Sequence, residues 1–331
     1  MFTQHLSDDP GQNQSLWQRS PHNPLIPARA QDWCKDFLAN SMILEIDGSL
    51  IMYVEGSTDS TEQIGAFTCP LADIEKGEWT AHPSNPILRV SEGSFDSGSV
   101  FDPSVVRFGD EYRMYYSATK GDPHDQAKLL SDRVHDDLPT SSNEQTIGAA
   151  IAEDPFRFTK LGREPVMEGR CPHVVQHEGT LYMFFVKVVD EGYRIYLAIS
   201  EDGVDFHEVN DSPILTVGAP GEWDSQTVTT PQVIKDDGYF CMLYAGDDRS
   251  LDDPSGIGLA VSEDLVHWNK IDGNPIFVTG PPGQFDSATI ACPILREFNG
   301  KYYLWYAGSD RSIRDGLHSQ VGMAILEPSK G

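Results

Sequence analysis

Asp102 is the residue of this chain whose type and position most directly suggest acid–base chemistry. It stands in the word Phe101-Asp102-Pro103-Ser104, and the residues at the matching position of related words are Ala39, Cys171, Thr230 and Cys292. A carboxylate that occurs in one copy out of five is not required by the repeat itself. Either it lies in a pocket, where a positioned carboxyl group can transfer a proton, or it is a hydrogen-bonded aspartate at a strand end.

A second group of candidates departs from the repeat in the run Glu168-Gly169-Arg170-Cys171-Pro172-His173. Glu168 is a candidate general acid, with an ordinary loop glutamate as the alternative. Arg170 could bind a carboxylate, a phosphate or sugar hydroxyls through its planar fork, or it could pair with an aspartate of a neighbouring repeat. His173 is either a buried strand histidine or a contact to a ligand.

The remaining candidates flank the same points of the repeat. Asp36 is a candidate base or a turn residue. An Asp-Ser word recurs, so its aspartates either bond backbone N–H groups in turns or contact a substrate; they are Asp96, Asp224 and Asp286. Two later words match each other, so their arginines either shape the rim or bind substrate; they are Arg249 and Arg311.

The repeated unit predicts the elements that position these residues. One copy contains the words Pro231-Gln232-Val233, Tyr244-Ala245-Gly246 and Ile257-Gly258-Leu259-Ala260. Such words are rich in aromatic and β-branched residues and are separated by turn words such as Asp237-Gly238, which is typical of strands joined by hairpins. Five copies of the unit predict an all-β protein, a five-bladed β-propeller with four-stranded antiparallel blades.

The two ends of the chain predict that the ring is closed. An aromatic residue followed by a proline, as in Trp268 and Pro275, ends four of the units, but nothing comparable follows Met323. The missing pair, Trp17 and Pro24, is found near the N-terminus instead. An N-terminal strand that completes the last blade explains this arrangement.

The repeat also predicts the blade boundaries within one domain, residues 1–331. Blade 1 spans about 36–90, blade 2 about 98–168, blade 3 about 169–216, blade 4 about 226–278, and blade 5 about 288–326 together with 15–27. The polar insertion Thr119–Gln145 predicts a lid, a pocket wall, a partner contact or a disordered loop. Because inner strands converge on a propeller's axis, we expect the candidate residues to share one axial pocket.

Composition limits the partners. Lysine and arginine total 24 against 51 acidic residues, a formal net charge of −27, which argues against binding to nucleic acid or to anionic membranes. The polar N-terminus is not a signal peptide, and no apolar run of about 18 residues is present. Five cysteines in spacings unlike a zinc site predict thiols in a reducing cytoplasm.

The words Asp102-Pro103-Ser104-Val105, Tyr115-Tyr116-Ser117 and Ile147-Gly148-Ala149-Ala150 resemble those of the five-bladed propeller glycosidases, glycoside hydrolase family 43 and its relatives in families 32, 68 and 130. The resemblance implies acidic residues at the inner strands of blades 1 and 2 and a glutamate acid in blade 3. Asp102 matches, whereas Asp36 and Glu168 are offset substitutes and Arg170 occupies the glutamate's place. Family 130 phosphorylases use basic residues for phosphate, which would give Arg170 a role.

Two hypotheses about function follow. The first is a glycosidase-like enzyme, a hydrolase or else a phosphorylase or transferase, acting on a furanoside or small oligosaccharide with Asp102 as orienting carboxylate, Glu168 as acid and Asp36 as base. The second is a divergent propeller that binds a carbohydrate or small polar metabolite, or performs a non-glycosidase step. Neither requires a cofactor, although a structural Ca²⁺ in the central channel would suit so many acids.

Overall fold

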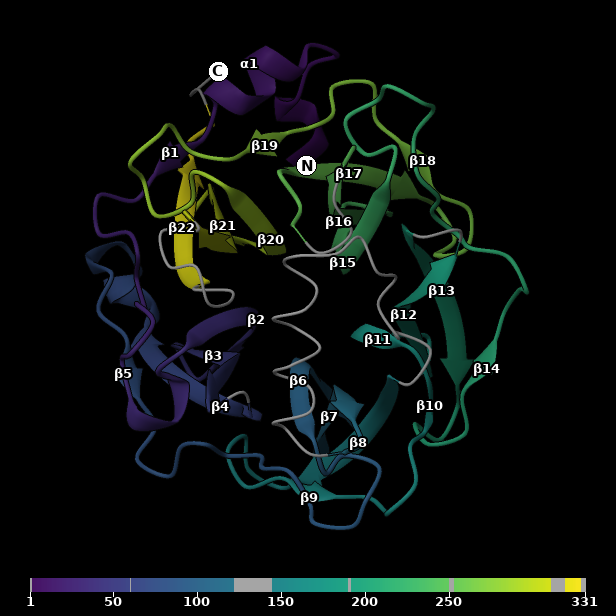
Figure 1. Cartoon of the computed structure of the whole chain (residues 1–331). Helices are drawn as coiled ribbons and strands as arrows, with labels where there is room; N and C mark the ends of the chain where they lie inside the picture. The colour runs from purple at the N-terminus through teal and green to yellow at the C-terminus, as the bar shows by residue number, and fades with distance from the viewer. Residues whose placement is uncertain are drawn as a thin grey trace.

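The computed structural model describes residues 2–59, 61–121, 145–189, 192–249, 253–310 and 319–328, with the backbone alone for Asn40 and Ser41. Most of the insertion Thr119–Gln145 therefore lies outside the described residues. Five antiparallel sheets surround one axis, as the sequence predicts (Figure 1). In each sheet the chain begins at the axis and runs outward, except that the outermost strand of the last sheet comes from the N-terminus.

The bounds of the elements follow the repeat. Blade 1 contains β2 (Phe37–Ile46), β3 (Ser49–Thr58), β4 (Thr61–Pro70) and β5 (Thr80–Ala81). Blade 2 contains β6 (Ser99–Phe108), β7 (Glu111–Thr119), β8 (Thr146–Ala152) and β9 (Thr159–Lys160), with β10 (Met167–Glu168) beside β8. Blade 3 contains β11 (Arg170–His177), β12 (Thr180–Val189), β13 (Gly192–Ser200) and β14 (His207–Glu208).

The last two blades repeat the pattern. Blade 4 contains β15 (Thr227–Asp236), β16 (Tyr239–Asp247), β17 (Gly256–Ser262) and β18 (Asn269–Lys270), with β19 (Phe277–Val278) beside β17. Blade 5 contains β20 (Thr289–Phe298), β21 (Lys301–Ser309), β22 (Gln320–Leu326) and β1 (Gln18–Arg19). The short helices are η1 (Phe2–His5), α1 (Pro10–Ser15), η2 (Asp32–Cys34) and η3 (Leu71–Lys76).

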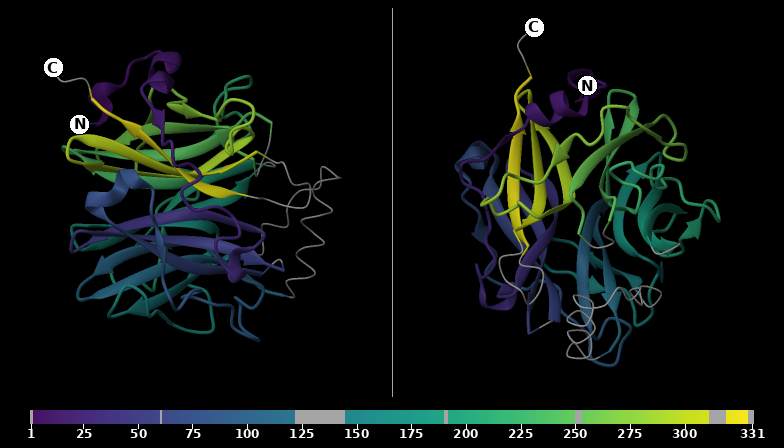
Figure 2. Two further views of the ribbon diagram at one scale, coloured as in Figure 1. Left: turned by 90° about the vertical axis from the view of Figure 1, so that its left-hand side faces the viewer. Right: turned by 45° about the horizontal axis from the view of Figure 1, so that its top comes forward.

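Ring closure by the N-terminal strand is confirmed. In the register of β1 with β22, Gln18 is opposite Ile325 and Arg19 is opposite Ala324. Asn23 then exchanges side-chain hydrogen bonds with the backbone of Met323. Asn85 and Asn274 do the same for the third strands of blades 1 and 4. Figure 2 shows the N-terminal segment at the outer edge of the molecule, beside the end of β22.

Local sequence explains the hairpins and their packing. The Asp47-Gly48 and Asp237-Gly238 turns have positive φ at both residues, which a tight two-residue hairpin requires. Gly258 on β17 lies under the Tyr244 ring, where an added Cβ would be 2.6 Å from the Tyr244 ring carbon Cζ. The glycine of this repeated word is therefore needed so that the buried tyrosine ring can lie across the next strand.

Each inner strand carries a β-bulge near its start. The register of the first hairpin shifts between Phe101 and Ser104 in blade 2, and the bulged residue Asp102 has a left-handed φ of 49°. The equivalent residues of blades 3, 4 and 5 have φ between 46° and 55°; they are Cys171, Thr230 and Cys292. A bulge of this kind re-aims a side chain, and here it does so at the axis.

The axis-to-rim packing buries apolar side chains between adjacent blades, for example Trp305 and Tyr303 of blade 5 against Leu38 and Ile43 of blade 1. Among the residues that the structure describes, no helix is long and apolar enough to cross a bilayer.

Candidate functional site

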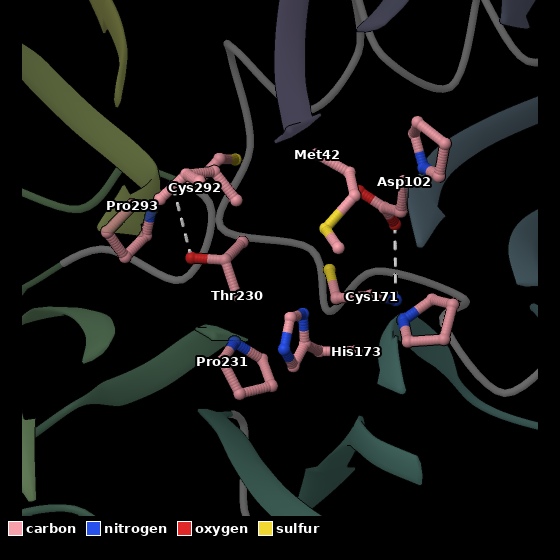
Figure 3. A pocket seen from close by; sticks show the side chains of 11 residues that line it. Met42, Asp102, Cys171, His173, Thr230, Pro231, Cys292 and Pro293 are labelled. Atoms are coloured by element: carbon pink, nitrogen blue, oxygen red, sulfur yellow. Dashed lines mark hydrogen bonds between the residues drawn. The ribbon is translucent and has the colours of Figure 1, made fainter. Parts of the chain in front are cut away.

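The five inner strands enclose a small axial cavity (Figure 3). Its volume is about 40 Å³, room for a few water molecules but not for a sugar ring. Most of the lining is apolar or sulfur-containing, and the polar side chains among its residues are Asp102, His173 and Thr230. A substrate would therefore have to bind at the mouth of this cavity rather than inside it.

Asp102 is held by groups from its own blade and from blade 3. Its Oδ2 accepts a 2.6 Å hydrogen bond from the Ser117 hydroxyl and a 3.2 Å hydrogen bond from the Cys171 backbone N–H. Ser117 Oγ in turn accepts from the same Cys171 N–H at 2.8 Å. The side chain is 5% exposed, so the carboxylate is buried but lines the cavity.

The hydrogen bond to blade 3 is part of the fold rather than a special property of aspartate. In blade 4 the equivalent residue, Thr230, accepts a 3.2 Å hydrogen bond through Oγ1 from the Cys292 N–H of blade 5. A threonine is thus sufficient to connect two neighbouring bulges. The acidity of Asp102 exceeds what this connection requires.

Glu55 on β3 is a buried carboxylate that the sequence interpretation did not select. Its Oε2 accepts a 2.6 Å hydrogen bond from the Asp102 backbone N–H, and the residue is 6% exposed. The sequence contained a signal for Glu55, because no other blade has an acidic residue at the same register position. The residues there are Ser117, Val186, Ala245 and Ala307. A search of second strands for residues that break the repeat would have found it.

The pKa values of two thiols at the axis depend on the charged groups around them. Burial raises the pKa of the Cys171 thiol, and the nearby Asp102 carboxylate raises it further, while Arg170 lowers it. Burial likewise raises the pKa of the Cys292 thiol, with Glu55 and Asp102 adding to the increase and Arg170 opposing it. Two carboxylates and one guanidinium therefore act on the same small volume.

Arg170 is oriented by aromatic rings. Its Nη1 donates a 2.5 Å hydrogen bond to the Tyr193 hydroxyl, and its Cζ lies 4.9 Å from the Tyr193 ring centroid and 5.9 Å from that of Phe101. Such packing reduces the rotamer freedom of a long side chain. The guanidinium is therefore held at the start of β11 by the hydroxyl and the ring of Tyr193.

His173 lies in the lining of the cavity and is buried. Its Nε2–H donates to the Val233 carbonyl oxygen at 3.2 Å. Burial, with the Arg296 guanidinium nearby, lowers the pKa of His173 to about 4, whereas the hydrogen bond to Val233 opposes the shift. The histidine is thus neutral at ordinary pH and serves the connection between blades 3 and 4.

The repeated aspartates lie in blade interiors and not in the cavity lining. Each accepts hydrogen bonds on Oδ2 from a tyrosine hydroxyl and a cation, instead of from backbone N–H groups. The sets are Asp96 with Tyr116 and Lys160, Asp224 with Tyr244 and Lys270, and Asp286 with Tyr306 and Arg19. This common geometry accounts for their recurrence, and our proposal for the substrate site does not include them.

The other predicted site residues are not brought into the cavity. Asp36 is exposed at the start of β2, where it lines a separate hollow of about 590 Å³ with Arg29 and Lys35. Glu168 is exposed on β10. Arg249 is exposed, with its Nε 2.9 Å from Asp248 Oδ1, and Arg311 lies outside the described residues.

The lining does not fit a calcium ion, which takes six to eight oxygen ligands. Of the lining residues, Asp102 alone carries a carboxylate. In the part of the chain that the structure describes, no group of three or more His, Cys, Asp or Glu residues is arranged to hold a metal ion.

Comparisons with known proteins agree with the five-bladed fold. No protein-family model matches the chain. The uncharacterized protein Rv1502 of Mycobacterium tuberculosis is 26% identical over 319 residues, which cover 91% of this chain and 96% of that protein. A solved structure from the GH130 family of mannoside phosphorylases, which contains glycoside hydrolases that target β-1,2-mannosidic linkages, has a TM-score of 0.66 at 18% identity, covers 94% of each chain and shows the likeness of fold.

One curated relative is similar enough to show the family. The 1,2-β-oligomannan phosphorylase of Thermoanaerobacter sp. (strain X514) is 30% identical over 265 residues, which cover 74% of this chain and 75% of that protein. The predicted resemblance to five-bladed propeller glycosidases is thereby confirmed. With its five-bladed ring and this degree of identity, the chain belongs to the glycosidase-like enzyme family that includes the 1,2-β-oligomannan phosphorylase.

Proposed function

We propose that the protein cleaves the glycosidic bond of a mannoside, with Asp102 as proton donor to the leaving sugar and inorganic phosphate as acceptor of the mannosyl group. The observation that carries the proposal is the placement of one unrepeated carboxylate, Asp102, at the axial cavity, where it accepts the backbone N–H of Cys171, the residue next to Arg170. The 30% identity to an oligomannan phosphorylase supports the choice of substrate class.

The reaction needs one acid and one bound anion. Asp102 gives its proton to the glycosidic oxygen as the bond from that oxygen to the anomeric carbon breaks. A phosphate oxygen forms the new bond to the same carbon, and the proton carried by phosphate restores the carboxyl group of Asp102. The products are a sugar 1-phosphate and a saccharide shortened by one unit.

Among the residues that the structure describes, the carboxylates other than Asp102 support phosphorolysis over hydrolysis. A hydrolase needs a second carboxyl group that activates water or attacks the sugar. Asp36 and Glu168 are exposed and do not line the axial cavity, and the Glu55 carboxylate accepts the Asp102 backbone N–H behind the lining. Phosphate supplies its own nucleophile, so the arrangement of one acid beside an arginine is sufficient.

The space for the substrate lies above the cavity. A volume of about 40 Å³ admits water alone, so we place the reacting sugar at the mouth, against the bulges of blades 2 and 3. The hollow of about 590 Å³ at the start of β2 is within the range of small-molecule sites and would receive further sugar units. Asp36 would then act as a substrate contact.

The proposal is tested by product analysis. The protein is incubated with β-1,2-linked mannooligosaccharides with and without inorganic phosphate, and the products are separated. Formation of mannose 1-phosphate that requires both phosphate and Asp102 supports phosphorolysis, with Asp102→Asn as the matched control. Free mannose formed without phosphate would replace it with hydrolysis, and the absence of any product across linkages and sugars would contradict both.

We also propose that the protein works in the cytoplasm. All five cysteines are free and buried, as expected of thiols that are kept reduced. A phosphorylase also requires the millimolar phosphate of the cell interior to proceed towards cleavage. Fractionation of cells that produce the protein would contradict this if the protein were found outside them.

A further inference from the structure

We propose that Glu55 is a positioning residue for Asp102, acting through the backbone of Asp102 to fix the direction in which its carboxyl group meets the substrate. The inference rests on the proposed function, since it assumes that Asp102 is the proton donor. It adds Glu55 of blade 1 to the groups that hold Asp102, which otherwise come from blades 2 and 3.

The first step is the contact itself. The Asp102 N–H donates to Glu55 Oε2 at 2.6 Å, and both residues are buried, at 5% and 6% exposure. Asp102 sits in the left-handed region with φ 49°, a strained conformation that persists only where neighbours hold it. A short bond from a charged acceptor supplies such a restraint.

The second step is that the Asp102 N–H could be satisfied by a neutral acceptor and does not need a carboxylate. Ser117 occupies the register position of Glu55 one blade further on, and its hydroxyl accepts the Cys171 N–H at 2.8 Å. A neutral hydroxyl therefore satisfies the corresponding bulge amide of blade 3. The charged acceptor, Glu55, occurs at the bulge that carries Asp102. Hydrogen bonds to ionised groups are roughly twice as strong as those between neutral groups.

The third step is the effect on the proton donor. The Asp102 side chain is fixed from one side by Ser117 and Cys171, which bond to its carboxylate, and from the other by Glu55, which bonds to its backbone. A displacement of about 1 Å in a reacting group can reduce a rate by about 10²-fold. Loss of the Glu55 contact would allow the bulge to relax and the carboxyl group to turn away from the glycosidic oxygen.

The experiment compares Glu55→Ala, which removes the acceptor, with Glu55→Gln, which keeps an acceptor oxygen without the charge. We expect kcat to fall about 10²-fold in Glu55→Ala with the KM for the oligosaccharide nearly unchanged. Glu55→Gln should recover most of this loss. Ser104→Ala is the matched control, because Ser104 Oγ on β6 accepts the Val174 N–H of β11 at 2.9 Å, a buried bond between neighbouring blades whose acceptor is not bonded to the Asp102 N–H.

A second measurement does not depend on catalysis. The amide proton of Asp102 in the NMR spectrum of the ¹⁵N-labelled protein should lie far downfield and should move upfield in both Glu55 variants but not in Ser104→Ala. If the wild type cleaves no glycoside, the proposed function fails while the amide shift still decides whether Glu55 holds Asp102. Unchanged kcat in a folded Glu55→Ala, or an unmoved Asp102 amide, would overturn the inference.

Discussion

The buried carboxylates of the blade interiors differ from those at the axis in what surrounds them. In blade 4 the Asp224 carboxylate accepts hydrogen bonds from the Tyr244 hydroxyl and from Lys270 Nζ. A set of one aspartate, one tyrosine and one basic residue recurs in blades 2 and 5. At the axis, Asp102 is bound by a hydroxyl and a backbone N–H, and its counterpart in blade 4 is a threonine. Repetition therefore marks the carboxylates that pair with a cation inside the blades, whereas the buried carboxylates at the axis, Asp102 and Glu55, depart from it.

In blade 1 all three residues of this aspartate–tyrosine–cation set are replaced together. Cys34 packs against Gly56 at the position where Asp224 packs against Gly246 in blade 4. Ala81, opposite Phe67 on β4, holds the register position of Lys270, opposite Ala260 on β17. Blade 1 thus lacks the anion and the cation together, which avoids leaving either one buried without its partner.

The largest effect expected from this comparison is on catalysis. Asp102→Thr should lower kcat by about 10²–10⁴-fold, the contribution of a general acid. The fold should be retained, because Thr230 already occupies the equivalent bulge with φ 46° and bonds the next blade. Steady-state kinetics with a mannooligosaccharide and a thermal melt of the same sample would measure both. A folded variant with wild-type kcat would exclude Asp102 as the acid.

The next effect is on stability and leaves the axis untouched. Asp224→Cys should lower the free energy of unfolding by about 3 kcal/mol, since it leaves Lys270 without its carboxylate. Adding Tyr244→Val and Lys270→Ala, which reproduces the set of blade 1, should restore part of the loss. Urea unfolding of the single and triple variants would measure the difference. A triple variant less stable than Asp224→Cys would contradict the view that the set is exchanged as a unit.

The axis should also respond to pH through His173. Its pKa is about 4 in the folded protein against about 6.5 unfolded, so between these values the unfolded state binds more protons. The stability contribution is complete above about pH 6.5 and is lost as the pH falls toward 4, amounting to about 3 kcal/mol. His173→Gln should flatten that part of the stability curve measured by urea unfolding. A curve identical to the wild type would show that another group is responsible.

The smallest effect is expected at the two exposed carboxylates. Asp36→Asn and Glu168→Gln should lower kcat by well under the roughly 10²-fold that marks loss of a general acid or base. The reason is that both side chains are exposed and neither lines the axial cavity. Kinetics of both variants beside Asp102→Thr would test this. A loss as large as that of Asp102→Thr would restore the sequence-based assignment of acid or base.

The fold could be predicted from the sequence because repetition is visible in the words themselves. Turn residues, tyrosine-rich second strands and the displaced Trp17 required no knowledge of long-range contacts. Ring closure also places Arg19 where Lys160 and Lys270 lie in blades 2 and 4, a side-chain contact that the sequence analysis did not predict.

The site was harder to predict in blade 1 because two consecutive tyrosines in blade 2 allow two alignments of the repeat that differ by one residue. The sequence alignment counted back from Tyr53 and therefore matched Ala39 to Asp102. In the structure Ala39 pairs with Glu55 as Phe101 pairs with Ser117, so Ala39 is the equivalent of Phe101. The backbone of Asn40 is then the equivalent of Asp102. Tyr53 thus corresponds to Tyr115, the first of two consecutive tyrosines in blade 2. Burial, which separates Glu55 from exposed Glu168, follows from the assembled ring and is not encoded in local words.

The strand that completes the last blade has a consequence for folding of the protein. Asn23 and its partner Met323 are 300 residues apart, so β1 cannot pair until β22 has been synthesised. Such long-range contacts form late because chain entropy opposes them. Blades 1 to 4 can assemble during translation, whereas the ring can close only after β22 has left the ribosome.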